Sequence, residues 1–243
     1  MKHTLIALNA FCKHLVLLVR PHAWLGFLRS PMLFFSNTLA LSRWIARQPK
    51  VAMNDFPVLK RDYNKRYKLY RHVTDSCSLQ GIPVDYLEFG VFGGKSFEWW
   101  VKGNNHPDSR FYGFDTFEGL PEKWGVFFGK GSMYADVPSL SDTRATFVKG
   151  LFQDTLVPFL QQHPMNNDRR KIIHLDADLF SSTLFALSML FPYLKKGDIL
   201  FFDEFNVPNH EFQALKIFTE TFYVSTELIG AVNNYYQVAV MVK

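Results

Sequence analysis

The chain is poor in cysteine. Only Cys12 and Cys77 occur among its 243 residues, and they lie far apart without the close spacing of cysteine metal ligands. Such a pair excludes a disulfide framework and is typical of a reducing compartment. We therefore expect the protein in the cytoplasm.

The sequence also lacks the signature of a nucleic-acid-binding protein, although its formal net charge is +5. Much of the basic excess lies between Lys50 and Arg71, where only Asp55 and Asp62 oppose it. Aromatic residues are not interleaved with these bases as on a nucleic-acid-binding surface, so we expect no nucleic-acid partner. A solvated helix face is the favoured interpretation of this stretch, and contact with an anionic surface is the alternative.

No hydrophobic run is both long and uninterrupted. Residues 4–19 are strongly apolar, but Lys13 and His14 interrupt them and Arg20-Pro21 ends the run. The run is too short and too broken for a membrane span, and no small-residue cleavage site follows it. A second apolar patch spans 24–35. We predict two or three short amphipathic helices that cover the core or a homo-oligomer interface, with peripheral membrane contact as the alternative.

What the chain does have is the composition of one globular domain. Its apolar fraction of 48% and charged fraction of 20% are usual for soluble proteins. A chain of this length can bury a sizeable core. We expect residues 1–80 to form a helical cap or oligomerisation segment, which ends in a helix over 58–80. Residues 81–243 are expected to form an α/β core.

Apolar strands alternate with helical segments from residue 81 onwards. We expect strands at 84–89, 111–114, 146–149, 171–176 and 198–203, and helices at 96–102, from 154, at 182–194 and at 208–220. This alternation predicts a parallel sheet flanked by helices, and strands near 222–229 and 235–242 predict a closing hairpin. The fold class is therefore α/β, a doubly wound, mostly parallel, seven-stranded Rossmann-like sheet with a C-terminal antiparallel hairpin and an N-terminal helical cap.

One connection is unusually long. Residues 117–142 separate the second predicted strand from the third, and connections of this length are often lids or substrate loops. We expect the aromatic residues of this segment, Trp124, Phe127, Phe128 and Tyr134, to close over a substrate.

The loop after the first predicted strand has the features of a cofactor-binding turn. Gly90, Gly93 and Gly94 separate the strand from a helix that begins near Ser96, and glycine lets a backbone approach a ligand closely. The spacing differs from the G-x-G-x-x-G pattern of dinucleotide sites. Glu88 at the strand end would repel a pyrophosphate, so a ligand with a cationic or neutral polar end suits this loop better.

Acidic residues gather at the carboxyl ends of the predicted strands, where open α/β sheets bind ligands. They are Glu88, Asp115, Asp176 with Asp178, and Asp203 with Glu204. Asp115 is placed to accept hydrogen bonds from a ribose, although a turn aspartate is the alternative. Phe152 and Gln153, after the third strand, could flank an adenine ring.

Two of these carboxylates predict a metal site. Asp176 and Asp203 end neighbouring strands if the strand order is 3-2-1-4-5, and such strands lie about 4.8 Å apart. Carboxylates at this spacing repel each other unless they are protonated or bridged by a cation, and Mg²⁺ prefers oxygen ligands. Asp176, Asp203 and Glu204 are therefore candidate ligands, with helix N-caps as the alternative.

Asp178 could accept a proton from a substrate hydroxyl. His174 lies one residue pair deeper than Asp176, where a hydrogen-bonded core histidine is favoured over a catalytic one.

The motifs of the chain resemble a known family. Tyr86-Leu87-Glu88-Phe89-Gly90-Val91, Gly113 to Pro121 (Gly-Phe-Asp-Thr-Phe-Glu-Gly-Leu-Pro), Gly150-x-Phe152-x-Asp154, His174-Leu175-Asp176-x-Asp178 and Asp203-Glu204-Phe205 follow one another in order. Together they resemble the macrocin and mycinamicin sugar O-methyltransferases (TylF/MycF-like). The resemblance implies a class I methyltransferase that uses S-adenosylmethionine (SAM) and Mg²⁺ to methylate a hydroxyl of a sugar or related natural product.

The resemblance also assigns roles to residues. Glu88, Gly90 and Ser96 would line the methionine end of SAM, and Asp115 would hold the ribose. The full expected cofactor set is Glu88, Gly90, Val91, Ser96, Asp115, Thr116, Phe152, Gln153 and Asp176. The expected metal ligands are Asp176, Asp203 and Glu204, and the expected catalytic residues are Asp178, Asp176 and His174.

One departure from the family pattern stands at the metal site, where Asp203-Glu204 replaces the common Asp-Asp pair. The longer second side chain could weaken or reshape the site. A non-catalytic SAM-binding module therefore stays an alternative to the enzyme. A nicotinamide-dependent oxidoreductase of the same fold is a second alternative, disfavoured by the glycine spacing and the carboxylates.

Overall fold

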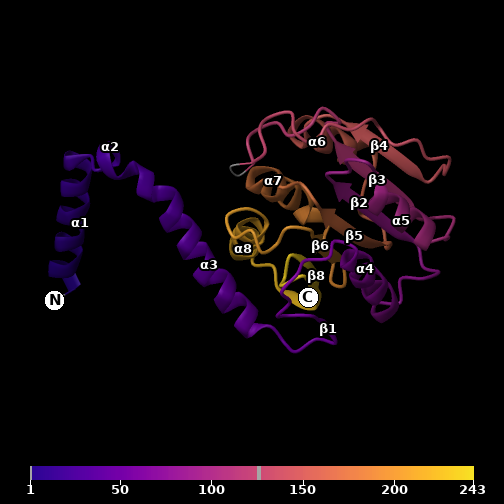
Figure 1. Cartoon of the computed structure of the whole chain (residues 1–243), viewed down its shortest axis with the longest axis horizontal. Helices are drawn as coiled ribbons and strands as arrows, with labels where there is room; N and C mark the ends of the chain where they lie inside the picture. The colour runs from indigo at the N-terminus through magenta and orange to yellow at the C-terminus, as the bar shows by residue number, and fades with distance from the viewer. Residues whose placement is uncertain (1, 125–126) are drawn as a thin grey trace.

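A computed structural model of the chain describes residues 2–124 and 127–243. It consists of an α/β domain and a group of N-terminal helices that project away from it (Figure 1). The described residues contain one eight-stranded sheet with the order β1-β7-β8-β6-β5-β2-β3-β4. Its strands are β1 (Met53–Asn54), β2 (Val84–Phe89), β3 (Arg110–Asp115), β4 (Ala145–Lys149), β5 (Arg170–Leu175), β6 (Ile199–Phe202), β7 (Thr226–Val232) and β8 (Gln237–Val242).

The predicted topology is confirmed. Strands β4, β3, β2, β5 and β6 are neighbours in this order and parallel, which is the predicted 3-2-1-4-5 arrangement. Strands β7 and β8 form the predicted antiparallel hairpin at one side. The sheet has one strand more than predicted, because the two-residue β1 pairs in parallel with β7. A strand of two residues is too short for a sequence pattern to reveal.

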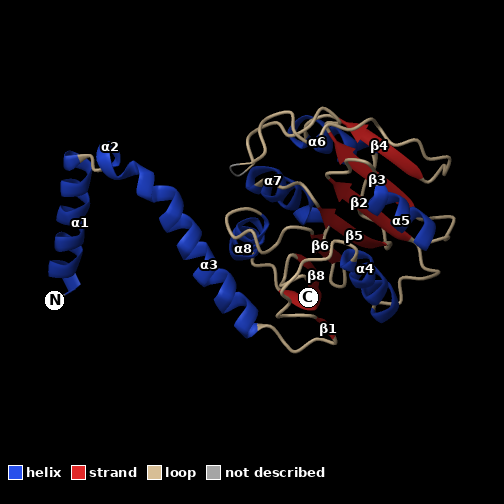
Figure 2. Ribbon diagram, viewed as in Figure 1, coloured by secondary structure: helices blue, strands red, loops and turns tan. Residues whose placement is uncertain are grey.

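Helices cover both faces of the sheet (Figure 2). Helices α6 (Phe152–Gln162), α7 (Phe180–Leu190) and α8 (Glu211–Phe222) pack on one face, and α4 (Lys65–Ser76) and α5 (Lys95–Gly103) pack on the other. A 3-10 turn, η2 (Phe191–Tyr193), follows α7. Helix α4 is shorter than the predicted 58–80, because its first seven predicted residues form an irregular loop.

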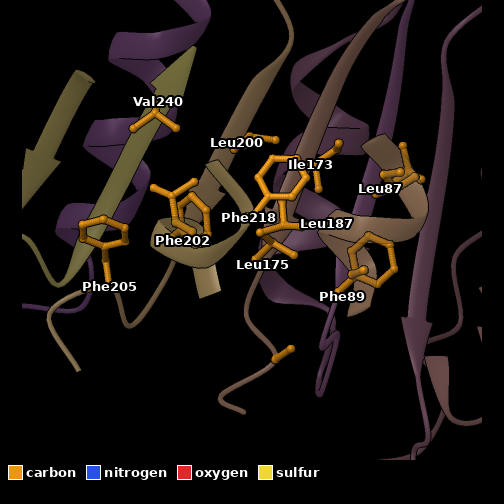
Figure 3. Close-up of a cluster of buried hydrophobic side chains, with 14 of the residues drawn as sticks. Leu87, Phe89, Ile173, Leu175, Leu187, Leu200, Phe202, Phe205, Phe218 and Val240 are labelled. Atoms are coloured by element: carbon orange, nitrogen blue, oxygen red, sulfur yellow. The ribbon is translucent and has the colours of Figure 1, made fainter. Parts of the chain in front are cut away.

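Strand residues alternate between two buried layers. Leu87, Phe89, Leu175 and Phe202 contribute to the layer shared with α7 and α8, which Figure 3 shows together with Phe218. The residues between them face α4 and α5. Burying one such side chain contributes about 1.5–3 kcal/mol to folding. A parallel sheet buried on both faces needs apolar residues on both, which explains why these strands are nearly continuous hydrophobic runs.

The first 47 residues form longer helices than predicted. They are α1 (Lys2–Val19), α2 (His22–Leu25), the 3-10 turn η1 (Gly26–Leu28) and α3 (Arg29–Arg47). Helix α1 is continuous through Lys13 and His14 for 18 residues, so the prediction of only short helices is wrong for this segment. It is the one helix in the described parts of the chain that is long and apolar enough to cross a membrane. Along Lys2–Val19 no residue is buried, and α3 buries Asn37 and Leu41.

Candidate cofactor and metal site

A cavity of about 370 Å³ opens at the carboxyl ends of β2, β3, β5 and β6. This size falls within the usual range of small-molecule sites, roughly 300–1,000 Å³. Its walls contain most of the predicted site residues together with several that were not predicted. They are Tyr63, Arg66, Gly90, Phe92, Asp115, Thr116, Gly119, Leu120, Pro121, Met133, Leu151, Phe152, Gln153, Asp176, Ala177, Asp178, Ser182, Asp203 and Glu204.

Gly90 is required where the loop leaves β2. Its φ is +91°, and a Cβ at this position would lie 1.9 Å from the backbone oxygen of Asp176. Backbone bonds hold the two segments together, since the Asp176 N–H donates to the Phe89 carbonyl at 2.9 Å. Any larger residue would have to push β2 and β5 apart. The glycine therefore brings the loop against the first carboxylate of the acidic cluster.

Asp115 lines the cavity and also organises its loops. One carboxylate oxygen, Oδ2, accepts hydrogen bonds from the N–H groups of Val91 and Phe92, both at 2.8 Å. The other, Oδ1, accepts one from the N–H of Phe117 at 2.8 Å. The sequence interpretation left a ribose contact and a turn aspartate as alternatives, and the structure shows the turn role. Val91 is buried and lies behind the cavity wall.

Glu88 and Ser96 lie beneath the loop and not in the cavity wall. The Glu88 carboxylate is fully buried and accepts hydrogen bonds from the hydroxyls of Tyr86 and Ser96, both at 2.5 Å. Burial raises the pKa of Glu88 to about 8. Because Glu88 follows Tyr86 by two residues, its side chain points to the α4 and α5 face of the sheet and not out of the strand end. The expected contact of these two residues with a ligand is therefore not direct in this structure.

His174 is likewise a buried residue and not part of the cavity wall. It pairs in register with Glu88, and its ring nitrogens lie 2.8 Å from the Tyr86 hydroxyl and 3.3 Å from the Tyr70 hydroxyl. Burial lowers the pKa of His174 to about 3, so the imidazole is neutral at physiological pH. His174 supports the cavity floor from below, as the favoured interpretation predicted, and the placement speaks against the catalytic assignment.

Four carboxylates converge in the wall formed by β5, β6 and the loops that follow them: Asp176, Asp178, Asp203 and Glu204. Ligand atoms of His174, Asp176 and Asp203 lie within 4.8 Å of one another. Burial and the neighbouring Glu204 raise the pKa of Asp178 to about 9, and burial raises that of Asp203 to about 6. Both pKa shifts reflect the energetic cost of holding several negative charges close together away from water.

Arg66 partly neutralises the negative charge of this cluster. It was not among the site residues predicted from the sequence. Its guanidinium lies 2.7 Å from Asp203 Oδ2 and 3.6 Å from Asp176 Oδ2. The basic stretch that contains it was interpreted as a solvated helix face, but here the base turns inward. A usable signal was present, because Tyr63, Arg66 and Tyr70 recur at helical spacing and so share one side of α4 and the loop before it.

The residues of the cluster fit a hard divalent cation. Arg66 supplies one positive charge against four carboxylates. In the described part of the chain, Asp203 Oδ1 and Glu204 Oε2 are buried without a hydrogen-bond partner. Unpaired buried carboxylate oxygens are the ligands that Mg²⁺ prefers. The other oxygen of Glu204, Oε1, accepts a hydrogen bond from the Tyr236 hydroxyl, which fixes the longer side chain.

The long segment 117–142 contributes to the cavity, but through other residues than predicted. Gly119, Leu120, Pro121 and Met133 line the cavity. Phe127 and Tyr134 are exposed, and Trp124 stacks on Phe128 with ring centroids 4.9 Å apart. These four predicted lid residues are not among the lining residues. Gly125 and Val126, between them, lie outside the described residues.

The segment that contains the acidic cluster matches a known protein family. A family profile described as Macrocin-O-methyltransferase (TylF) matches residues 134–237. This part of the chain is similar to the TylF family. The matched residues include the Gly150, His174-to-Leu179 and Asp203-to-Phe205 motifs, and the glycine loop at 90–94 lies outside them.

Two curated proteins that are similar to this chain are O-methyltransferases by name. One, from Streptomyces olivaceus, is the 8-demethyl-8-(2,3-dimethoxy-alpha-L-rhamnosyl)-tetracenomycin-C 4'-O-methyltransferase, 28% identical over 170 residues, which are 59% of this chain and 61% of that protein. Another is the mycinamicin III 3''-O-methyltransferase of Micromonospora griseorubida, 23% identical over 59% of this chain and 64% of that protein. The match thus spans about three fifths of the length of these relatives.

Solved structures of two methyltransferases share the fold of this chain. The calicheamicin methyltransferase CalS11 superposes with a TM-score of 0.55 at 22% identity and covers 85% of this chain and 91% of its own. The O-methyltransferase NovP gives a TM-score of 0.56 at 22% identity, covering 73% and 79%. The predicted fold class is thereby confirmed.

Proposed function

We propose that the chain is an O-methyltransferase that uses SAM to methylate a hydroxyl of a small sugar or natural-product acceptor. The observation that carries this proposal is the single cavity that joins the Gly90 loop to the four-carboxylate cluster in a TylF-related chain. The names of the curated relatives support the acceptor class. Cys12 and Cys77 are both free, which supports a cytoplasmic site of action.

The donor would lie along the glycine-loop side of the cavity. SAM, when bound, supplies an electrophilic methyl group on a sulfonium centre. Asp115 and Thr116 at the end of β3 line the cavity and would contact the ribose. Phe152 and Gln153 at the start of α6 also line it and would flank the adenine ring. Glu88 and Ser96 would act from beneath by fixing the loop that Gly90 begins. Together these residues would hold the donor in line with an acceptor.

The acceptor would lie against the acidic cluster. Asp176, Asp203 and Glu204 would hold Mg²⁺, which when bound would orient the acceptor hydroxyl and lower its pKa. Asp178 lines the same wall. A bound cation would lower its raised pKa, and the ionised carboxylate would then take the hydroxyl proton. Bound SAM would supply the methyl group in exchange for the hydroxyl proton, with S-adenosylhomocysteine as the second product. Leu120, Pro121 and Met133 would exclude water.

Calorimetric titration of SAM into the purified chain, with and without Mg²⁺ and beside a dinucleotide, tests the donor site. We expect micromolar SAM binding and no dinucleotide binding. Absence of SAM binding under both conditions would refute the proposal. SAM turnover with sugar and phenol acceptors then tests the reaction.

A second candidate, a SAM-binding module without catalysis, is favoured by one observation, because Arg66 contacts both Asp176 and Asp203 where a cation would bind. Turnover that is lost with a chelator and in Asp203→Asn, but kept in the exposed control Asp108→Asn, would support the enzyme. SAM binding without turnover on any acceptor would support the module.

A further inference from the structure

We propose that the N-terminal arm, residues 2–47, anchors the chain in the surface of an anionic lipid bilayer. The arm comprises α1, α2, η1 and α3, and it projects from the α/β domain beside α8 (Figure 1). This inference does not rest on the proposed reaction.

The arm exposes a large apolar surface. Leu17, Leu18 and Phe27 are each more than 70% exposed, and Trp24 is 60% exposed. Many more large apolar side chains of the arm are exposed: Leu5, Ile6, Leu8, Phe11, Leu15, Val16, Val19, Leu25, Leu28, Met32, Leu33, Phe34, Phe35 and Leu39. A patch of this extent exceeds the few hundred Å² that soluble monomers usually expose, so it marks an interaction surface.

The charge of the arm selects the partner. Residues 2–47 contain six of the 27 Lys and Arg residues and none of the 22 Asp and Glu residues. The rest of the chain holds 21 basic and 22 acidic residues, so the positive net charge of the molecule comes from the arm. Basic residues beside an apolar surface are attracted to anionic lipid headgroups. A second copy of the arm would bring like charges together with no acid to pair them.

The pattern of α1 favours a position in the plane of the interface. Lys2, Asn9 and Lys13 lie seven and four residues apart, so they share one side of the helix. Leu8, Phe11, Leu15 and Leu18 lie on the opposite side. A spanning orientation would place Lys13 inside the hydrocarbon, whereas an in-plane helix keeps it among the headgroups.

The link between α1 and α3 has the composition of a membrane-interface turn. Arg20 and Arg29 flank a segment that exposes Trp24 and Phe27. Tryptophan prefers the headgroup level of a bilayer, and arginine side chains reach phosphate groups from there. The turn and α1 thus both combine exposed apolar side chains with basic ones, as a membrane-surface segment does.

The other end of the arm is fixed to the domain. The Asn37 side-chain amide donates hydrogen bonds to Asn209 at 2.9 Å and Gln213 at 3.0 Å. Trp44 packs on Phe205 with ring centroids 4.9 Å apart. Phe205 directly follows Glu204 of the acidic cluster. One continuous helix, α3, therefore joins the proposed anchor to the loop beside the cavity.

Flotation of the full chain with lipid vesicles tests the anchor, because flotation separates bound protein from aggregates. We expect flotation with vesicles that contain phosphatidylglycerol and not with phosphatidylcholine alone. The double variants Lys13→Glu/Arg20→Glu and Trp24→Ser/Phe27→Ser should each weaken binding at least about tenfold. Matched controls are Lys68→Glu/Arg71→Glu and Leu59→Ser/Tyr223→Ser, which change exposed residues outside the arm and should float like the parent chain.

Three results would overturn the proposal. The first is no flotation with either vesicle, and the second is equal flotation with neutral and anionic vesicles. The third combines two observations. Light scattering detects a self-associated parent chain that does not bind vesicles, and the Trp24→Ser/Phe27→Ser variant is monomeric. That last result would assign the arm to a second copy of the chain.

Discussion

Single residues fix the close contact between the glycine loop and the end of β5, and Gly90 is the clearest case. We expect Gly90→Ala to lower the free energy of unfolding by about 2 kcal/mol, because its Cβ would meet the Asp176 carbonyl and its φ is strained for alanine. SAM binding should be lost with it. Gly93→Ala is the control, since open space surrounds that position. Urea unfolding of both variants makes the comparison, and equal stabilities would contradict this account.

Glu88 gives a second prediction at the residue scale, in the pH dependence of stability. Its pKa rises on folding from 4.5 to about 8, so at neutral pH the folded state binds a proton that the unfolded state has lost. The stabilising protonated form is lost as pH rises towards 8, and this one group lowers stability by about 1.4 kcal/mol per pH unit.

The Glu88→Gln variant should therefore lose stability less steeply than the parent chain between pH 6.5 and 8. The buried histidines contribute a slope of the opposite sign near pH 6.5, but they do so equally in both chains, so the difference between the two slopes reports Glu88. Urea unfolding at three pH values measures it. Glu98→Gln changes a half-exposed carboxylate on α5 that pairs with Lys102, and it should keep the parental slope. An unchanged slope in Glu88→Gln would assign the proton to another group.

Among the elements, α3 has two different halves. Its N-terminal half is exposed, whereas Trp44 in its last turns packs on Phe205 and Phe212. We expect Trp44→Ala to lower the free energy of unfolding by about 2–3 kcal/mol, because it removes a large partly buried side chain. Met32→Ala, on the exposed half, should change it by less than about 0.5 kcal/mol. Similar losses in both would show that α3 docks along its whole length.

At the scale of the whole molecule, the acidic cluster should make thermal stability depend on divalent cations. Saturating Mg²⁺ should raise the melting temperature by about 5 °C, because a ligand that binds only the folded state stabilises it. Differential scanning fluorimetry with Mg²⁺ and with a chelator measures the shift. Asp203→Asn should abolish the shift and Asp108→Asn should keep it. A parent chain whose melting temperature does not change with Mg²⁺ would indicate that Arg66 alone neutralises the cluster.

Much of the fold was determined by local sequence patterns. Strand and helix periodicity predicted the parallel order of five strands and the closing hairpin, because β2, β3, β5 and β6 are buried on both faces and crossovers between parallel strands are right-handed as a rule. The same order predicted that Asp176, Asp178, Asp203 and Glu204 would meet, since the carboxyl ends of neighbouring parallel strands share one edge of the sheet.

Only the tertiary structure decided which side chains reach the cavity. Glu88 and His174 stand near strand ends, yet the alternation of the strand turns both beneath the floor. Arg66 reaches the cluster from α4, more than a hundred residues away in sequence from Asp176, and no local pattern sets that distance. Local periodicity fixes which face a residue occupies, whereas long-range packing fixes what that face meets.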